Sequence, residues 1–269
     1  MNDRAVEEVA QRAITGDRDA VEALVRALQG DIYALSLRML WNREDAEDAT
    51  QEILIRVITR LSSFDFRSRL KTWAYRVAVN YLLDAKRSVV ERMNLNFVRL
   101  SADLVEGLAA DGPAADERSV LVEEVKIGCT LAMLQCLDRP HRLAYILGEI
   151  LDLRGPEAAD ALDIDPSLLR KRLERARSAI LSFTRSYCGL VSDDAACRCH
   201  RRVPAAVRLG RVRLDALEFA DRAVSFDEVR TAVRRAEDAR RALEVHRTSR
   251  PRESSVDLSR RIIAAIDAS

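Results

Sequence analysis

The sequence has few of the features that mark an enzyme, a membrane protein or a secreted protein. Its 269 residues include three histidines and nine glycines. The histidines are dispersed, no glycine-rich phosphate loop is present, and no nucleophile lies at a recognisable spacing from a base, so an enzyme is not expected. No apolar run of about 18 residues occurs, so no membrane span is predicted. The N-terminus, MNDRAVEEVAQRA, lacks the apolar core of a signal peptide, and we therefore expect a cytoplasmic protein.

Two further absences bear on the fold and on the partners. Alternation of apolar and polar residues, which marks a half-buried strand, is missing throughout, so the sequence predicts an all-α fold. The net charge is only +1, because 44 lysines and arginines nearly balance 43 aspartates and glutamates. Any sign of a nucleic-acid partner must therefore come from local segregation of charge. Aromatic residues make up 5% of the chain, so a cluster of them is informative.

Acidic residues are concentrated in a helix that is expected over about residues 43–61. Its apolar stripe is formed by Ala46, Ala49, Ile53, Val57 and Leu61, and acidic residues project from the other faces. Acids in a first helical turn suit the helix dipole, at about 0.3–1 kcal/mol each. The polar patch continues for a further turn, so docking of a partner protein is an equally open explanation. The patch consists of Asp45, Glu47, Asp48, Gln51 and Glu52.

Aromatic and basic residues follow the acidic helix. A polar connection with Phe64 and Phe66 leads into a helix that is expected to begin at Thr72. Asp84 is the only acid between Lys71 and Val90. Because bases stack on aromatic rings while arginine and lysine hold phosphates, this pattern favours nucleic acid. The alternative is that the aromatic residues of the helix are ordinary core residues.

The second half of the chain predicts another helical domain. Residues 93–119 are acidic, contain glycine and proline and lack periodicity, so a flexible linker is expected there. Further on, Gly155-Pro156 begins a short helix, residues 163–166 form a tight turn, and a basic amphipathic helix follows. This layout is that of a helix-turn-helix. The alternative is a helical hairpin with a solvated basic face.

Taken together, the two halves resemble the sigma-70 family of RNA polymerase sigma factors. DAEDATQEI is similar to the acidic helix that docks on the polymerase clamp, and FRSRLKTWAYRVAVNYLLDAKR to the segment that melts and captures the −10 promoter element. LRGPEAADALDIDPSLLRKRLERAR resembles the helix-turn-helix that reads the −35 element. These two regions with no middle domain between them are the layout of the extracytoplasmic-function (ECF) group. Phe66 stands where the family often has glycine.

The resemblance implies a sigma factor that binds core RNA polymerase and promoter DNA, is not an enzyme, and is open to control by an anti-sigma factor. The acidic patch would dock on polymerase. Contacts with the −10 element would come from Phe64, Arg67, Ser68, Arg69, Lys71, Trp73, Arg76, Asn80, Lys86 and Arg87. Contacts with the −35 element would come from Ser167, Leu168, Arg170, Lys171, Arg172, Glu174, Arg175 and Arg177. The alternative function is a helix-turn-helix regulator that acts without core polymerase.

We expect a region 2-like domain over residues 1–92, the linker over 93–119, a region 4-like domain over 120–184 and a C-terminal extension over 185–269. The extension contains Cys188, Cys197, Cys199 and His200, four soft ligands of the kind that zinc takes tetrahedrally. Their spacing is not that of a common zinc knuckle, so a metal site and a plain thiol cluster are both open. No other cofactor is expected. Helices are predicted over about 226–243 and 258–266, and we expect the extension to regulate promoter access.

Overall fold

The computed structural model describes residues 3–85, 89–108, 116, 119–237, 240–254 and 256–267. Over these residues the regular structure is helical, apart from one isolated bridge between Cys188 and Cys197, so the predicted all-α fold is confirmed. In this part of the chain, no helix is long and apolar enough to cross a membrane. Contacts divide the chain into two compact units. The first comprises Met1–Arg92, Ile146–Lys171 and Glu253–Ser269, and the second comprises Met93–Tyr145 and Arg172–Arg252.

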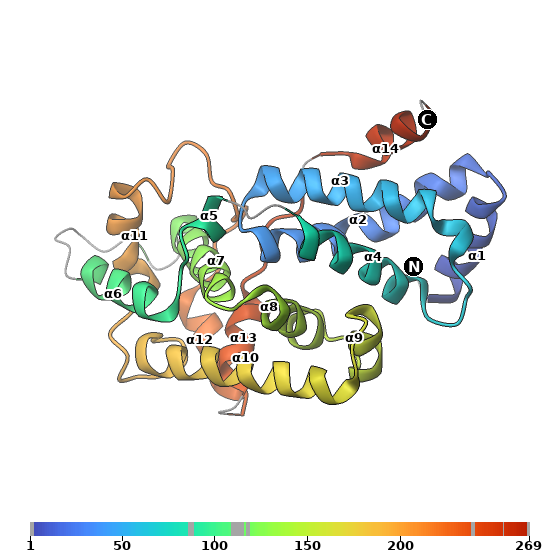
Figure 1. Ribbon diagram of the computed structural model, residues 1–269. Helices are drawn as coiled ribbons and strands as arrows, with labels where there is room; N and C mark the ends of the chain where they lie inside the picture. Colours follow the sequence, from blue (N-terminus) through green and yellow to red (C-terminus); the bar gives the residue numbers. More distant parts are fainter. Residues whose placement is uncertain are drawn as a thin grey trace. The chain divides into compact units, whose positions relative to one another are not determined.

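The first unit is built on helices from the N-terminal third of the chain, which pack on one another (Figure 1). They are α1 (Asp3–Ile14), α2 (Arg18–Leu40), α3 (Arg43–Thr59), the short η1 (Leu61–Ser63) and α4 (Leu70–Asp84), and the short α5 (Val89–Arg92) comes next in the chain. Segments distant in sequence complete the unit: η2 (Ile146–Ile150), α9 (Gly155–Ala161) and α14 (Leu258–Asp267). Helix α9 packs on α4, and α14 packs on both α2 and α3.

The boundaries of α2 and α3 follow from local capping. The side chain of Asp17 accepts a hydrogen bond from the backbone N–H of Ala20 at 3.1 Å and so caps α2. Asn42 caps α3 by accepting from the N–H of Asp45 at 2.8 Å. Helix α2 continues through Gly30 without a break. A glycine inside a helix costs about 1 kcal/mol, and burial of the surrounding apolar residues outweighs that cost.

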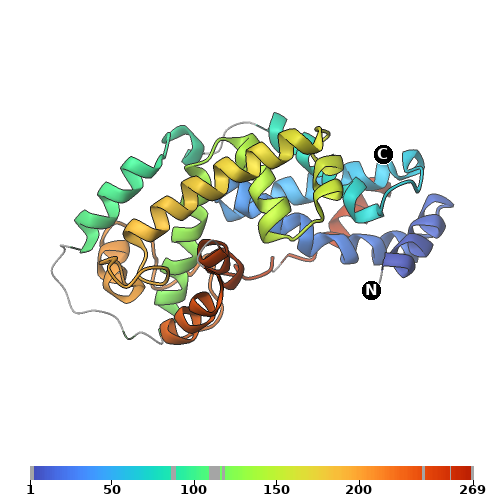
Figure 2. The same ribbon diagram turned by 90° about the horizontal axis from the view of Figure 1, so that it is seen from below.

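The second unit is formed by α6 (Phe97–Leu108), α7 (Val120–Gln135), α8 (Arg139–Tyr145) and much of α10 (Pro166–Tyr187), together with helices of the extension. Those helices are α11 (Cys199–Arg208), α12 (Phe226–Arg235) and α13 (Arg241–Thr248), which Figure 2 shows from below. One apolar cluster joins Val122 of α7 to residues of the extension: Leu190, Val191, Cys199, Val203, Phe226, Val229, Val233 and Val245. The extension up to Arg252 is therefore part of this unit's core.

Two expectations for this half of the chain need correction. The flexible linker predicted over 93–119 contains a helix, α6, whose Leu100 and Leu104 are buried. Its Asp103 forms ion pairs with Arg202 at 2.9 Å and Arg211 at 2.6 Å. The sequence did not reveal this helix, because its partners lie about a hundred residues further along the chain. The single helix expected over 226–243 is divided into α12 and α13.

A buried carboxylate also fixes the extension to α7. Glu124 is only 2% exposed, and its two oxygens accept hydrogen bonds from three successive backbone N–H groups of the extension. The donors are Glu218 at 2.8 Å, Phe219 at 2.9 Å and Ala220 at 2.6 Å. Charge-assisted hydrogen bonds of this kind compensate the desolvation of a buried carboxylate.

Candidate polymerase and promoter interfaces

The five residues of the acidic patch all lie on α3. Asp45 and Asp48 are exposed, and Gln51 and Glu52 are partly exposed. Glu52 accepts from the Arg56 guanidinium at 2.9 Å. Glu47 is more enclosed than the others, with 18% of its side chain exposed.

The enclosure of Glu47 has two causes. It pairs with Arg43 one turn earlier at 3.0 Å, and the hydroxyl of Ser254 donates to the same carboxylate oxygen at 3.1 Å. The segment that leads into α14 therefore contacts the acidic patch directly.

The connection between α3 and α4 presents an aromatic cluster. Phe64 is 4% exposed, and its ring centroid lies 4.5 Å from that of Phe66 and 5.5 Å from that of Trp73. Burial makes Phe64 a support for the other two rings rather than a surface on which a base could stack. Phe66 is 40% exposed and was not among the predicted contacts. Its φ of +58° explains why the family often has glycine there, since a side chain is disfavoured in this conformation.

One face of α4 gathers several predicted −10 contacts. Arg69, Trp73, Arg76 and Asn80 fall at i, i+4, i+7 and i+11, which places them along one side of a helix. Asn80 is exposed, whereas Trp73 and Arg76 are partly buried. We call these four residues the α4 face. Arg67 and Ser68 lie in the connection just before it, and Lys86 and Arg87 fall outside the described residues.

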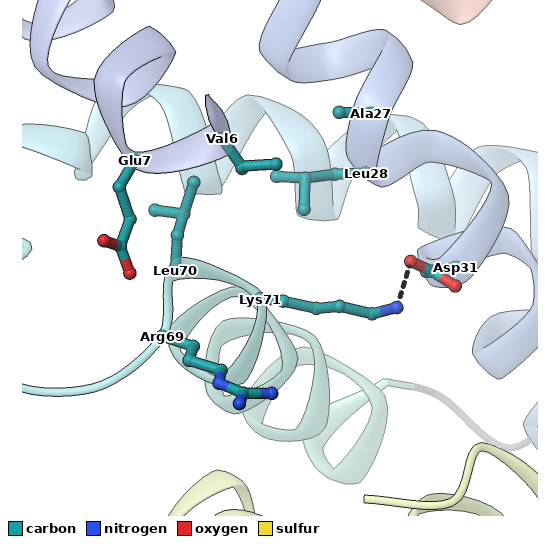
Figure 3. Close-up of a pocket in the computed structure, with 8 residues that line it drawn as sticks. All are labelled: Val6, Glu7, Ala27, Leu28, Asp31, Arg69, Leu70 and Lys71. Carbon is teal, nitrogen blue, oxygen red and sulfur yellow. Dashed lines mark ion pairs between the residues drawn. The ribbon is translucent and has the colours of Figure 1, made fainter. Parts of the chain in front are cut away.

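Lys71 points away from the α4 face. Its ammonium group pairs with Asp31 of α2 at 2.6 Å, as the close-up in Figure 3 shows. The two side chains belong to a small pocket lined by Val6, Glu7, Ala27, Leu28, Asp31, Arg69, Leu70 and Lys71. Lys71 is therefore not grouped with the other predicted −10 contacts.

Acids of α9 meet the α4 face, an arrangement that sequence reasoning missed. The Nε of Arg76 donates to the backbone oxygen of Asp160 at 2.9 Å, and its Nη2 pairs with the Asp160 carboxylate. Arg69 lies 3.3 Å from Glu157. A hydrogen bond from Arg154 and the positive charge of Arg69 hold the pKa of Glu157 below its ordinary value.

The predicted −35 contacts lie along the N-terminal part of α10. Asp165 accepts from the N–H of Ser167 at 2.6 Å and so caps the helix, as expected. Leu168 is 39% exposed, and Arg172 is the one partly buried member of the set. The exposed members are Ser167, Leu168, Arg170, Lys171, Glu174, Arg175 and Arg177. Buried Leu169, Leu173 and Ala176 form the opposite side, so the basic side chains project outward.

Comparisons with known proteins identify the family of this chain. The family model for sigma-70 region 2 matches residues 24–90, the segment that holds α3 and α4. The ECF RNA polymerase sigma factor SigW of Bacillus subtilis is 30% identical over 168 residues, which cover 61% of this chain and 89% of SigW. This chain belongs to the ECF sigma factors. Sigma factors are transcription initiation factors, so the expectation of a non-enzymatic protein is confirmed.

A further relative and a solved structure are also similar to this chain. The RNA polymerase sigma factor NccH of Alcaligenes xylosoxydans xylosoxydans is 30% identical over 190 residues, which cover 69% of this chain and 98% of NccH. Among solved structures, CnrH in complex with the cytosolic domain of CnrY is similar with a TM-score of 0.46 and 20% identity. That match covers 64% of this chain and 91% of CnrH.

Helix α7 and the extension of this sigma factor together hold a thiol cluster that differs from the predicted metal set. Cys188 and Cys197 are free cysteines whose backbones form an isolated β-bridge. The N–H of Gly189 donates to the carbonyl of Cys197 at 3.0 Å. Cys129 of α7 lies close enough to the cysteines of the extension to affect their ionisation. Burial raises the pKa of all four thiols, that of Cys197 to about 12.

His200 does not join this cluster; its ring lies 6.1 Å from that of Phe226, edge to face. We use the name thiol cluster for Cys129, Cys188, Cys197 and Cys199. Among the described residues, no three histidine, cysteine, aspartate or glutamate side chains are arranged to hold a metal ion. The predicted set of Cys188, Cys197, Cys199 and His200 does not fit a zinc ion as it stands.

Proposed function

We propose that this sigma factor binds core RNA polymerase through α3 and promoter DNA through α4 and α10, and so directs promoter recognition, DNA melting and transcription initiation. The observation that carries the proposal is the α4 face with its neighbouring exposed ring, Phe66, inside the segment matched by sigma-70 region 2. Residues 1–92 would act as the region 2-like domain and residues 120–184 as the region 4-like domain, with 93–119 between them. The protein would act in the cytoplasm, with core polymerase.

The acidic residues of α3 would dock on polymerase. Asp45 and Asp48 are exposed, and Gln51 and Glu52 extend the same patch by one turn. A surface of this charge suits a basic partner surface, because complementary charges speed association and fix register. Glu47 would contribute only after Ser254 has moved away, since the two side chains are hydrogen-bonded.

The α4 face would hold unpaired bases of the −10 element. Extruding a base costs a few kcal/mol of stacking, and stacking on an aromatic ring returns about 1–3 kcal/mol per base. Phe66 and Trp73 offer such rings, and Asn80 offers an amide for a base edge. Arg67, Ser68, Arg69 and Arg76 would contact the backbone and neighbouring bases, and Lys86 and Arg87 would hold phosphates of the adjacent duplex.

The exposed side of α10 would read the −35 element. Ser167, Arg170, Lys171 and Glu174 lie near the start of the helix, where a recognition helix meets base edges in the major groove. Arg172, Arg175 and Arg177 lie further along and would contact phosphates. Leu168 would give an apolar contact, which suits the methyl group of thymine.

Run-off transcription with purified core polymerase on a library of promoter fragments tests the proposed function. We expect specific new transcripts that are lost in the double variant Asp48→Ala with Glu52→Ala. Binding to duplex DNA without transcripts and without association with core polymerase would leave the alternative, a regulator that acts through its helix-turn-helix alone. An anti-sigma factor remains a prediction from the resemblance, and co-purification from the native host tests it.

The C-terminal extension would regulate access to the two interfaces. Its last segment contacts Glu47 and packs on α2 and α3. Removing everything after residue 184 would also remove much of the second unit's core, so truncation after Arg252 is the better test. An unchanged transcription level in that truncated protein would contradict a regulatory role for the last segment.

No cofactor is required for this function. The zinc set predicted from the sequence, Cys188, Cys197, Cys199 and His200, is tested by metal analysis of the purified protein. We expect no stoichiometric zinc, because burial favours the neutral thiols over the thiolates that zinc binds. One equivalent of zinc that is lost in Cys199→Ala and retained in the control Cys136→Ala would contradict a structural thiol cluster.

A further inference from the structure

Positive charge is concentrated in the C-terminal extension. Residues 185–252 carry sixteen arginines, no lysine and ten acids, a net charge of +6, whereas residues 1–184 carry 26 basic and 30 acidic residues. The densest part is 195–214, where six arginines occur and no acid. A chain that is nearly neutral as a whole therefore contains a local segregation of charge, which is typical of a segment that meets a polyanion.

Three of these six arginines contribute to the fold of the second unit. Arg202 is 5% exposed and pairs with Asp103 of α6, and Arg211 pairs with the same carboxylate. The guanidinium group of Arg198 donates to the backbone carbonyl of Ala195 at 2.5 Å. Their donors are therefore satisfied within the protein and do not need an external partner.

Two other arginines, on α11, are exposed. Neither the side chain of Arg201 nor that of Arg208 forms a hydrogen bond or an ion pair with the described residues. They are seven residues apart, so they lie on one side of the helix, separated by about 10 Å along its axis at about 1.5 Å per residue. The other side carries buried Cys199, Val203 and Ala206, and the helix packs on α6 and α7 (Figure 1). We call Arg201 and Arg208 the α11 face.

The α11 face suits the phosphate backbone of duplex DNA. A guanidinium group presents a planar fork of donors that matches phosphate oxygens, and it keeps its charge at any physiological pH. Side chains about 10 Å apart can reach phosphates on both sides of a minor groove, which is about 6 Å wide. Helix α11 also belongs to the same compact unit as α10 from Arg172 onward. The DNA that α10 would read is therefore bound by the unit that carries this face.

We propose that the α11 face binds phosphates of the duplex DNA upstream of the −35 element and so adds sequence-independent affinity to promoter binding. The inference rests on the proposed function of α10. Downstream of the −35 element the DNA leads to the −10 element, which the first unit would hold, so the upstream flank is left for the extension. Phosphate contacts strengthen binding without changing which base sequence is read. Each one also makes binding more sensitive to salt, because it releases about one counterion.

Binding of holoenzyme, reconstituted from core polymerase and the full-length protein, to two promoter fragments tests this proposal. One fragment ends directly upstream of the −35 element, and the other continues for about two helical turns, or about 20 base pairs. For Arg201→Gln with Arg208→Gln we expect binding to the long fragment to be weaker by about tenfold or more at about 0.1 M salt, with a salt slope smaller by about two. The short fragment should be bound as by wild type. The control, Arg235→Gln with Arg240→Gln, removes the same charge from exposed positions outside α11.

A loss that is confined to the long fragment and to the α11 variant supports the proposal. Unchanged binding by that variant overturns it, and so does an equal loss on both fragments, because the two arginines then contact no upstream DNA. An equal loss in the control also overturns it, since net charge and not the α11 face would then set the affinity. Circular dichroism checks that the variants are folded. Should the double variant fail to fold, Arg208→Gln alone repeats the test, with a salt slope smaller by about one.

Failure of the proposed function is visible in the same experiment. Holoenzyme with the wild-type protein would then bind the promoter no better than a scrambled fragment, and the upstream position of the contact would fail with it. Binding of the protein without polymerase to a random duplex decides the α11 face in that case. Equal affinity of wild type and Arg201→Gln with Arg208→Gln for that duplex would show that the face does not bind DNA.

Discussion

At the scale of single residues, aromatic side chains around α4 have different roles that their sequence positions do not reveal. Phe64 is buried and supports its neighbours, whereas Phe66 is exposed in a left-handed backbone conformation. The sequence predicted a DNA contact for Phe64, whereas the structure exposes the ring of Phe66. Burial of a ring depends on the packing of α3 and α4, which spacing alone does not give. The ring of Trp73 lies beside that of Phe64, with 5.5 Å between the two centroids.

The conformation of Phe66 allows its backbone and its ring to be tested separately. We expect Phe66→Gly and Phe66→Ala both to reduce promoter-specific run-off transcription about tenfold, because each removes the ring that we propose stacks on a base. The glycine variant should be about 1–2 kcal/mol more stable to urea than the alanine variant, because only glycine accepts positive φ without strain. Leu83→Ala, another exposed apolar residue of this region, should transcribe normally. Equal stability of the two Phe66 variants would contradict the conformation described.

The ion pairs of Asp103 predict a dependence of stability on pH. Burial alone would raise the pKa of Asp103, but Arg211 and Arg202 outweigh it and hold the pKa below its ordinary value. A lowered pKa in the folded state means that these pairs stabilise the protein above the unfolded-state pKa, and that this contribution is lost as pH falls through the folded-state value. We expect the unfolding free energy to fall below about pH 4, with a smaller fall in Asp103→Asn. If urea unfolding of wild type and of Asp103→Asn depends on pH in the same way, the ion pairs of Asp103 do not stabilise the protein.

Buried Glu124 gives a third residue-scale prediction. Replacing it by glutamine leaves one oxygen to accept from three backbone N–H groups and places an amide donor among them. The expected loss of unfolding free energy is about 2–3 kcal/mol, because a buried donor is left without its partner. Urea unfolding of Glu124→Gln measures it, and the exposed Glu228→Gln should change stability by less than about 0.5 kcal/mol. An equally small change in the unfolding free energy of both variants would show that the hydrogen bonds of Glu124 do not stabilise the fold.

At the scale of helices, capping and periodicity predicted the elements that carry the sites. Asp17, Asn42 and Asp165 cap the helices that follow them. The helix that the sequence did not predict is stabilised by distant partners. Helix α6 is held by Arg202 and Arg211. Local propensity is a weak guide wherever tertiary contacts supply the stabilisation.

Truncation after Arg252 tests the role assigned to α14. Leu258 and Ile262 are fully or almost fully buried against the first unit, so the shortened protein should lose about 2–5 kcal/mol of stability. Because Glu47 loses its hydrogen bond from Ser254, we also expect binding to core polymerase to become several-fold tighter. Ile262→Asp in the full-length chain should reproduce both effects. Weaker polymerase binding in both proteins would show that α14 supports the docking surface and does not restrict it.

At the scale of the whole molecule, segments that are distant in the sequence belong to the same compact unit. The sequence predicted two domains, one after the other, followed by an extension whose apolar faces need a partner surface. In the structure, residues 146–171 and 253–269 join the N-terminal helices, and most of the extension completes the core around α7. Such pairings between distant segments leave no local trace in sequence, because each amphipathic helix shows only that a partner is needed.

The proposed role of the α4 face is tested by promoter opening, read from a fluorescent base analogue placed in the −10 element of duplex promoter DNA. With core polymerase and wild-type protein, we expect a fluorescence increase that reports an unstacked base. Trp73→Ala with Arg76→Ala should still bind polymerase and DNA but reduce that signal at least tenfold. An undiminished signal with the double variant would show that another surface melts the promoter and would contradict the proposed role of the α4 face.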